Sequence, residues 1–187
     1  MKEKRLWLLS FCIVLILTMG SYRIWADNDK NTFVIDVACD ARTYRQNNVD
    51  PSVTGSNRGD TFIVQGKIYP GGTIPKGNGV FNPDNPGSIG TWICRGVWMV
   101  SSSELAAGAS PAFDTSQIYL LPSQSKQLFS EGLEGPSPTL RAVTGGTGSF
   151  AGFHGQVRQE LLGTNSTGLF NIRFTFHLQH SDQEQER

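Results

Sequence analysis

The sequence is poor in cysteine and in charge, and neither sign of charge is in excess. Three of its 187 residues are cysteines, 17% are Asp, Glu, Lys or Arg, and the formal net charge is zero. The basic residues beyond the N-terminus are scattered singly and form no patch of the kind that tracks nucleic-acid phosphates. We therefore expect no nucleic-acid partner.

A membrane-spanning run is also missing, because a span needs about twenty apolar residues. The longest apolar run, residues 6–19, follows a basic start and ends shortly before a candidate cleavage point ahead of Asp27. These features are typical of a secretory signal peptide, here residues 1–26. The sequence predicts an exported protein, secreted or periplasmic; an uncleaved leader is the alternative and the one route to a membrane.

Removal of the leader leaves 12 basic and 15 acidic residues, a net charge of −3, and two cysteines. These two, Cys39 and Cys94, either form one disulfide or stay as buried thiols. Because the thiols of exported proteins tend to be oxidised, we predict a disulfide between them.

Helical spacing is absent from every window of useful length, and alternation of apolar and polar residues takes its place. About eight segments alternate in this way, and Gly, Pro and Asn separate them, as turns require. The segments are 32–40, 60–69, 90–101, 115–121, 126–133, 139–144, 155–162 and 168–178. Two connections are long, 46–58 and 70–89, and we expect the second to be an ordered surface loop or a flap at the rim of the barrel.

Eight amphipathic strands in one small domain favour an all-β, closed, antiparallel eight-stranded barrel, because closure removes exposed strand edges. A two-sheet sandwich is the alternative. The barrel is expected to span residues 27–180, followed by a charged tail at 181–187. Eight strands enclose enough room for side chains or for one small ligand.

The apolar side chains that share the inward face are the candidate ligand contacts, and Ile172 lies on the same face. They are Phe33, Ile35, Val37, Phe62, Val64, Trp92, Trp98, Phe170, Phe174 and Phe176. Buried aromatic residues are also the usual filling of a core, so a barrel filled by its own side chains is the competing interpretation.

A glycine-rich run, residues 142–157, is open to two interpretations. Gly146, Gly148 and Ala151 match the G-x-G-x-x-A spacing of a dinucleotide-binding loop, but that loop needs a following helix. Here the chain continues as a strand. We expect the glycines to form a sharp turn, with Phe150 and Phe153 closing the end of the barrel.

The same run, "VTGGTGSFAGFHGQV", resembles a segment shared by plant allene oxide cyclases and dirigent proteins. The likeness extends to "GDTFIVQGKIY" at 59–69 and to "LFNIRFTFHL" at 169–178. The resemblance implies a small eight-stranded barrel, commonly a homotrimer, that acts through confinement and a few polar groups, without a cofactor or a metal. Where dirigent proteins carry an arginine after the glycines, this chain has His154.

Three functions are compatible with this sequence. The first is binding or orienting a small hydrophobic molecule inside the barrel, and the second is an isomerase or cyclase acting on a lipid or phenolic substrate. The third is a structural or interaction module with a filled barrel. Asp36, Asp40 and His154 are the polar candidates for catalysis, although solvated surface is the expected place of both aspartates.

Overall fold

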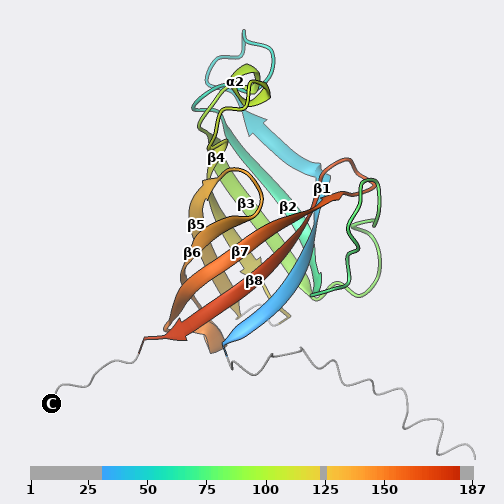
Figure 1. Ribbon diagram of the computed structural model, residues 1–187, viewed down its shortest axis with the longest axis vertical. Coiled ribbons are helices and arrows are strands. Elements are labelled where there is room, and N and C mark those ends of the chain that lie inside the picture. Colours follow the sequence, from blue (N-terminus) through green and yellow to red (C-terminus); the bar gives the residue numbers. More distant parts are fainter. Residues whose placement is uncertain (1–30, 123–125, 182–187) are drawn as a thin grey trace, which may run out of the picture.

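The structure is a computed structural model, and it describes residues 31–122 and 126–181 (Figure 1). Its eight strands close into one antiparallel barrel in which each strand pairs with the next and β8 pairs with β1. The strands are β1 (Thr32–Asn47), β2 (Thr61–Pro70), β3 (Gly90–Trp98), β4 (Phe113–Leu120), β5 (Gln127–Glu134), β6 (Thr139–Gly146), β7 (Phe153–Thr164) and β8 (Phe170–His180). The predicted fold is confirmed, and the sandwich is excluded. The predicted leader and residues 182–187 lie outside the described ranges.

The first strand is longer than the alternation predicts, and the strands that pair with it change along its length. β8 pairs with Thr32–Ala38, whereas β2 follows β1 as far as Asn47, past a bulge between Asp40 and Arg45. Beyond Ala38 the seam between β1 and β8 therefore has no ladder. At this height β1 bends and continues toward the top of the barrel, as Figure 1 shows.

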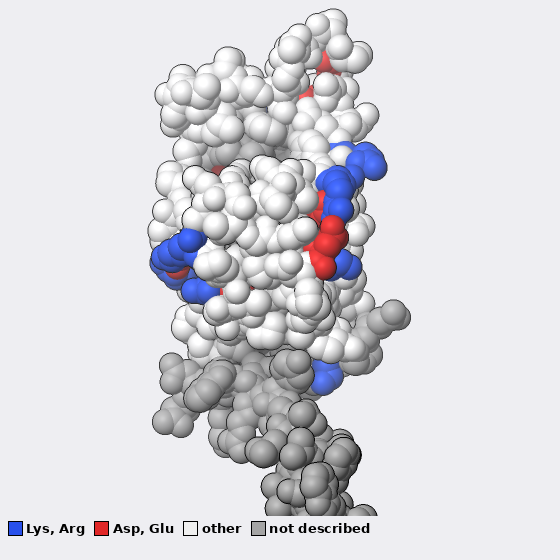
Figure 2. Space-filling view, turned by 90° about the vertical axis from the view of Figure 1, so that its right-hand side faces the viewer, with Lys and Arg blue, Asp and Glu red and all other residues white. Residues whose placement is uncertain are grey.

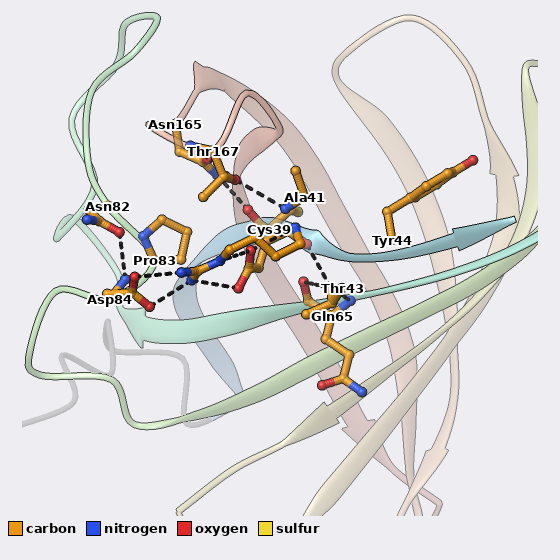
Figure 3. A network of polar contacts seen from close by, with 12 residues as sticks. Cys39, Ala41, Thr43, Tyr44, Gln65, Asn82, Pro83, Asp84, Asn165 and Thr167 are labelled. Atoms are coloured by element: carbon orange, nitrogen blue, oxygen red, sulfur yellow. Dashed lines mark hydrogen bonds and ion pairs between the residues drawn. The ribbon is translucent and has the colours of Figure 1, made fainter.

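Side-chain bonds hold the bend in place of the missing ladder (Figure 3). Asn165, in the turn between β7 and β8, donates from Nδ2 to the Cys39 carbonyl at 2.6 Å. The Arg42 guanidinium donates to both carboxylate oxygens of Asp40 and to both of Asp84. These bonds lower the pKa of both aspartates, and in each case the hydrogen bond from Arg42 is the largest cause. These side-chain contacts therefore fix the bend of β1 in the barrel wall.

The long connection at 71–89, here called the strap, is an ordered loop on the outside of the barrel, as predicted. Its Ile74 packs with Ala38, Tyr69 and Leu162 in a small apolar cluster outside the barrel interior. The Ile74 amide donates to Asp36 Oδ2 at 2.9 Å. The strap therefore covers the outer face of β1.

Aromatic rings close the lower end of the barrel, where β1 begins and β8 ends. Phe33 stacks on Phe176 with ring centroids 4.6 Å apart, and its centroid lies 5.9 Å from that of Phe150. Phe150 ends the 3-10 turn η1 (Gly148–Phe150), and β7 follows at Phe153. The glycine run is therefore a turn that carries an aromatic plug, and no nucleotide-binding helix follows it.

At the opposite end, the upper end, the short helix α2 (Ser102–Ala106) lies among the loops. Ser101 and Glu104 form a capping box, in which each side chain accepts from the other residue's backbone N–H. The sequence analysis missed α2, although Ser101 followed three residues later by Glu104 is a recognised start signal. No helix in the described ranges is long and apolar enough to cross a membrane.

Candidate functional site at the open end of the barrel

Inward-facing side chains are sealed in the lower part of the barrel and exposed near its upper end. On β7, Val157 is fully buried, whereas Leu161, two inward positions further up, is 45% exposed. On β8, Phe174 is fully buried and Phe170 is 46% exposed. Figure 2 shows a hollow between the loops at the top and the barrel below them. We call this region, bounded by the bend of β1 and the upper ends of β2 to β8, the open end.

Four aromatic side chains line one side of the open end. Tyr44 stacks on Phe62 with centroids 5.9 Å apart, and Phe62 meets the edge of Phe113 at 5.4 Å. Phe113 in turn makes a T-shaped contact with Trp98 at 4.6 Å. All four are half-buried, so part of each ring system faces the opening. Such surfaces favour a flat apolar ligand.

A carboxylate faces these rings from β5. Glu134 lies opposite Phe113 in the β4–β5 ladder, and its side chain is 18% exposed. Its Oε1 accepts from Thr115 Oγ1 at 2.7 Å, from Gln117 Nε2 at 2.9 Å and from Arg141 Nη1 at 3.3 Å. Three donors bind Oε1 and hold the carboxylate in place, and the second oxygen, Oε2, accepts from Gln159 Nε2 at 3.2 Å.

Arg141 lies beneath Glu134, inside the barrel, and its side chain is fully buried. Its remaining bonds fix it to the wall: Nη1 donates to the Gly132 carbonyl at 3.0 Å and Nη2 to the Thr115 carbonyl at 2.8 Å. A buried charge needs a counter-charge and hydrogen bonds, and Arg141 has both. This ion pair forms the floor of the open end.

Gln117 connects this floor to the filled part of the barrel. Its Oε1 accepts from Tyr119 Oη at 2.6 Å and from Trp92 Nε1 at 3.3 Å, while its Nε2 donates to Glu134 and Gln159. Gln159 Nε2 donates to Glu134 Oε2 at 3.2 Å. Burial raises the pKa of Tyr119, which keeps its hydroxyl protonated as a donor. The network is therefore continuous from the core to the opening.

The predicted ligand contacts divide between the sealed and the open parts. Six of them are buried in one core cluster, namely Ile35, Val37, Val64, Trp92, Phe174 and Phe176. Phe33 belongs to the lower plug, while Phe62 and Trp98 line the open end. Phe170, where β8 begins beyond the β1 ladder, is 46% exposed and lies at the open end.

The predicted disulfide is not formed: in the described part of the chain, Cys39 and Cys94 are free, buried thiols. The two cysteines face the same interior, as predicted, but β2 runs between their strands. Two strand spacings amount to about 9.6 Å, beyond the roughly 7 Å that a disulfide spans between Cα atoms. Burial is the main cause that raises the pKa of both thiols.

The three residues predicted as catalytic candidates are not brought together, and none faces the open end. Asp36 is fully buried beneath the strap, which corrects the expected solvated position, and it accepts from Arg173 Nε at 2.7 Å. Asp40 belongs to the bend with Arg42. His154 lies on the outer wall beside His177, in a hollow of about 480 Å³.

The sequence analysis missed the polar half of the site. Glu134 lies on the same inward face of β5 as Ser130, and Arg141 lies on the same inward face of β6 as Val143. Tyr119 points inward, and continuing the alternation along β4 from it would also have placed Gln117 and Thr115 inside the barrel. In the described ranges, no group of three or more His, Cys, Asp or Glu residues is arranged to hold a metal ion.

Comparison with known proteins supports the fold and leaves the family open. No family model and no curated protein sequence matches the chain. A solved structure named pyocyanin demethylase has a similar fold, with a TM-score of 0.53 and 16% identity over 79% of this chain and 99% of that one. At this identity, the likeness extends to the barrel fold and to nothing finer.

Proposed function

We propose that the protein binds a small, largely apolar molecule at the open end of the barrel. The observation that carries the proposal is that, among the described residues, inward-facing side chains are exposed at the open end: Leu161 and Phe170 are about half exposed, and Val157 and Phe174 are sealed. The mouth of a β-barrel is a common place for ligands, and exposed apolar surface there needs a reason.

The chemistry of the open end supports the same proposal. Half-buried aromatic rings line the wall on β1 to β4, and the Glu134 carboxylate with the fully buried Arg141 continues this wall on β5 and β6. A ligand site is typically an apolar surface with a few fixed polar groups, and this arrangement matches that description. The protein would thus act as a binding or orienting barrel, in line with its resemblance to dirigent proteins and allene oxide cyclases.

Binding is tested by a matched pair of substitutions and two readouts. Leu161→Arg places a charge in the open end, whereas Leu140→Arg places it on the outer wall, where Leu140 is 65% exposed. We expect wild type and Leu140→Arg to retain a co-purifying compound by mass spectrometry and to bind 2-naphthol, and Leu161→Arg to lose both. A folded wild type that retains no compound and binds no aromatic probe would contradict the proposal.

A second function, cofactor-independent catalysis, is favoured by Glu134 itself. A carboxylate fixed by four donors and partly open to a bound molecule is suited to proton transfer. The structural neighbour is named as a demethylase, which shows that an enzyme can have this fold. If the compound that co-purifies with the protein is converted, we expect Glu134→Gln to abolish turnover while retention of the compound persists.

A further inference from the structure

We infer that the open end selects flat aromatic molecules that carry a hydrogen-bond acceptor at one end, for Trp98, and a donor at the other, for Glu134. This inference rests on the proposed function, since it names the class of ligand that the same site takes. Two observations support it. Among the described residues, the buried indole N–H of Trp98 has no hydrogen-bond partner, and Oε2 of Glu134 accepts a single hydrogen bond.

The unpaired donor is the indole N–H of Trp98. Among the described residues its Nε1 is buried and has no hydrogen-bond partner, and its ring makes a T-shaped contact with Phe113 at the open end. Burial raises the pKa of the neighbouring Tyr44 hydroxyl and the Trp98 N–H lowers it in part, but the two groups do not meet in hydrogen-bond geometry. Instead, Tyr44 donates to Gln46.

A buried donor without an acceptor is costly, and the great majority of such groups in folded proteins are paired. The other indole of the barrel shows the contrast, because Trp92 Nε1 donates to Gln117 at 3.3 Å in the sealed part. An acceptor atom on a bound molecule would satisfy Trp98 in the same way. The unpaired N–H therefore points to a ligand with an acceptor.

The second polar contact is Glu134 Oε2. Within the described part of the chain, Oε1 accepts from three side chains, whereas Oε2 accepts from Gln159 alone, at 3.2 Å. A carboxylate oxygen has room for more than one donor, and hydrogen bonds to an ionised acceptor are the stronger ones. A hydroxyl or N–H of the ligand is the matching group.

The ladder places the residues that make these two contacts two strands apart. Trp98 lies opposite Phe113, and Phe113 lies opposite Glu134, so the three residues form one row across β3, β4 and β5. The row spans two strand spacings, about 9.6 Å between the outer Cα atoms. A single ring lying over Phe113 is short for this span, so we infer a scaffold of two or more fused rings.

The test uses four ligands of one shape: naphthalene, quinoline with an acceptor, 2-naphthol with a donor, and 6-hydroxyquinoline with both. We expect wild type to bind 6-hydroxyquinoline most tightly, with each polar group improving the dissociation constant about tenfold, as one net hydrogen bond does. Trp98→Phe keeps the ring and removes the N–H. It should abolish the advantage of quinoline over naphthalene and leave that of 2-naphthol.

Glu134→Gln should give the reverse pattern, a smaller advantage for 2-naphthol and an unchanged one for quinoline. An NMR measurement on wild type avoids any effect of the substitution on folding: the Trp98 indole N–H resonance should move downfield with quinoline but not with naphthalene. Equal binding of all four ligands at the open end would overturn the inference and leave the proposed function standing. Binding of none would contradict the proposed function itself.

Discussion

The two ends of the barrel are built from the same alternating strands, yet one is closed and the other is open. At the lower end, Phe33 stacks on Phe176, and Phe150 from the glycine turn packs beside them. At the upper end, β1 leaves β8 after Ala38, and the equivalent inward position of β8, Phe170, is left uncovered. The difference shows that a break in one ladder is enough to turn part of a core into a surface.

The largest effect should come from removing a phenylalanine at the closed end. Phe176→Ala should lower the free energy of unfolding by about 3–5 kcal/mol, the usual result for a buried ring. Phe170→Ala, on the same strand and face, should change it by only about 0.5 kcal/mol. Urea unfolding measures both, and equal losses would remove the distinction between the ends.

The floor of the open end should be the next most sensitive part. Arg141→Leu leaves Glu134 without its counter-charge and should cost about 3 kcal/mol, as breaking a buried pair does. Arg158→Leu removes an outward arginine whose side chain is 42% exposed, and an exposed pair contributes only about 0–1 kcal/mol. Chemical denaturation of the two variants gives the comparison; a smaller loss for Arg141→Leu would refute the buried floor.

The strap should respond to acid, with a small effect. Hydrogen bonds from Lys76 of the strap and from Arg158 lower the pKa of Glu160 from 4.5 to about 2. Because the folded-state pKa is depressed, the stabilisation is present above pH 4.5 and is lost as the pH falls toward 2. Glu160→Gln should therefore be less stable than wild type at pH 6, and the gap should close over this range.

Thermal unfolding at pH 6, 4 and 2 measures the difference in stability between wild type and Glu160→Gln. Glu131→Gln is the control, because Glu131 is exposed on the outer face of β5. A gap that stays constant with pH would show that the ionised Glu160 does not hold the strap.

The alternation of the sequence predicts the barrel because a period of two leaves one apolar face per strand and closure buries all of them. The bend is not predictable in this way, since "RTYRQN" at 42–47 is polar and resembles a loop. Its strand character comes from pairing with β2 and from the bonds of Arg42 to Asp40 and Asp84. The pairing with β2 and the bond to Asp84 join segments that are distant in sequence.

The candidate site was predicted in part. Phe62 and Trp98 were identified as inward-facing, whereas Glu134 and Arg141 were not, because a charged residue at an inward position conflicts with the apolar pattern. Alternation also placed Cys39 and Cys94 in the same interior but gave no measure of the distance across β2. Sequence periodicity assigns side chains to a face, and the lateral order of the strands decides which of them meet.

Thiol labelling of two variants on one strand tests the central claim most directly. Val157→Cys and Leu161→Cys both introduce an inward thiol on β7, in a barrel whose native Cys39 and Cys94 are buried. We predict that Leu161→Cys reacts with a thiol reagent in the folded protein nearly as fast as after unfolding, and that Val157→Cys is strongly protected. Equal protection at the two positions would contradict an open end.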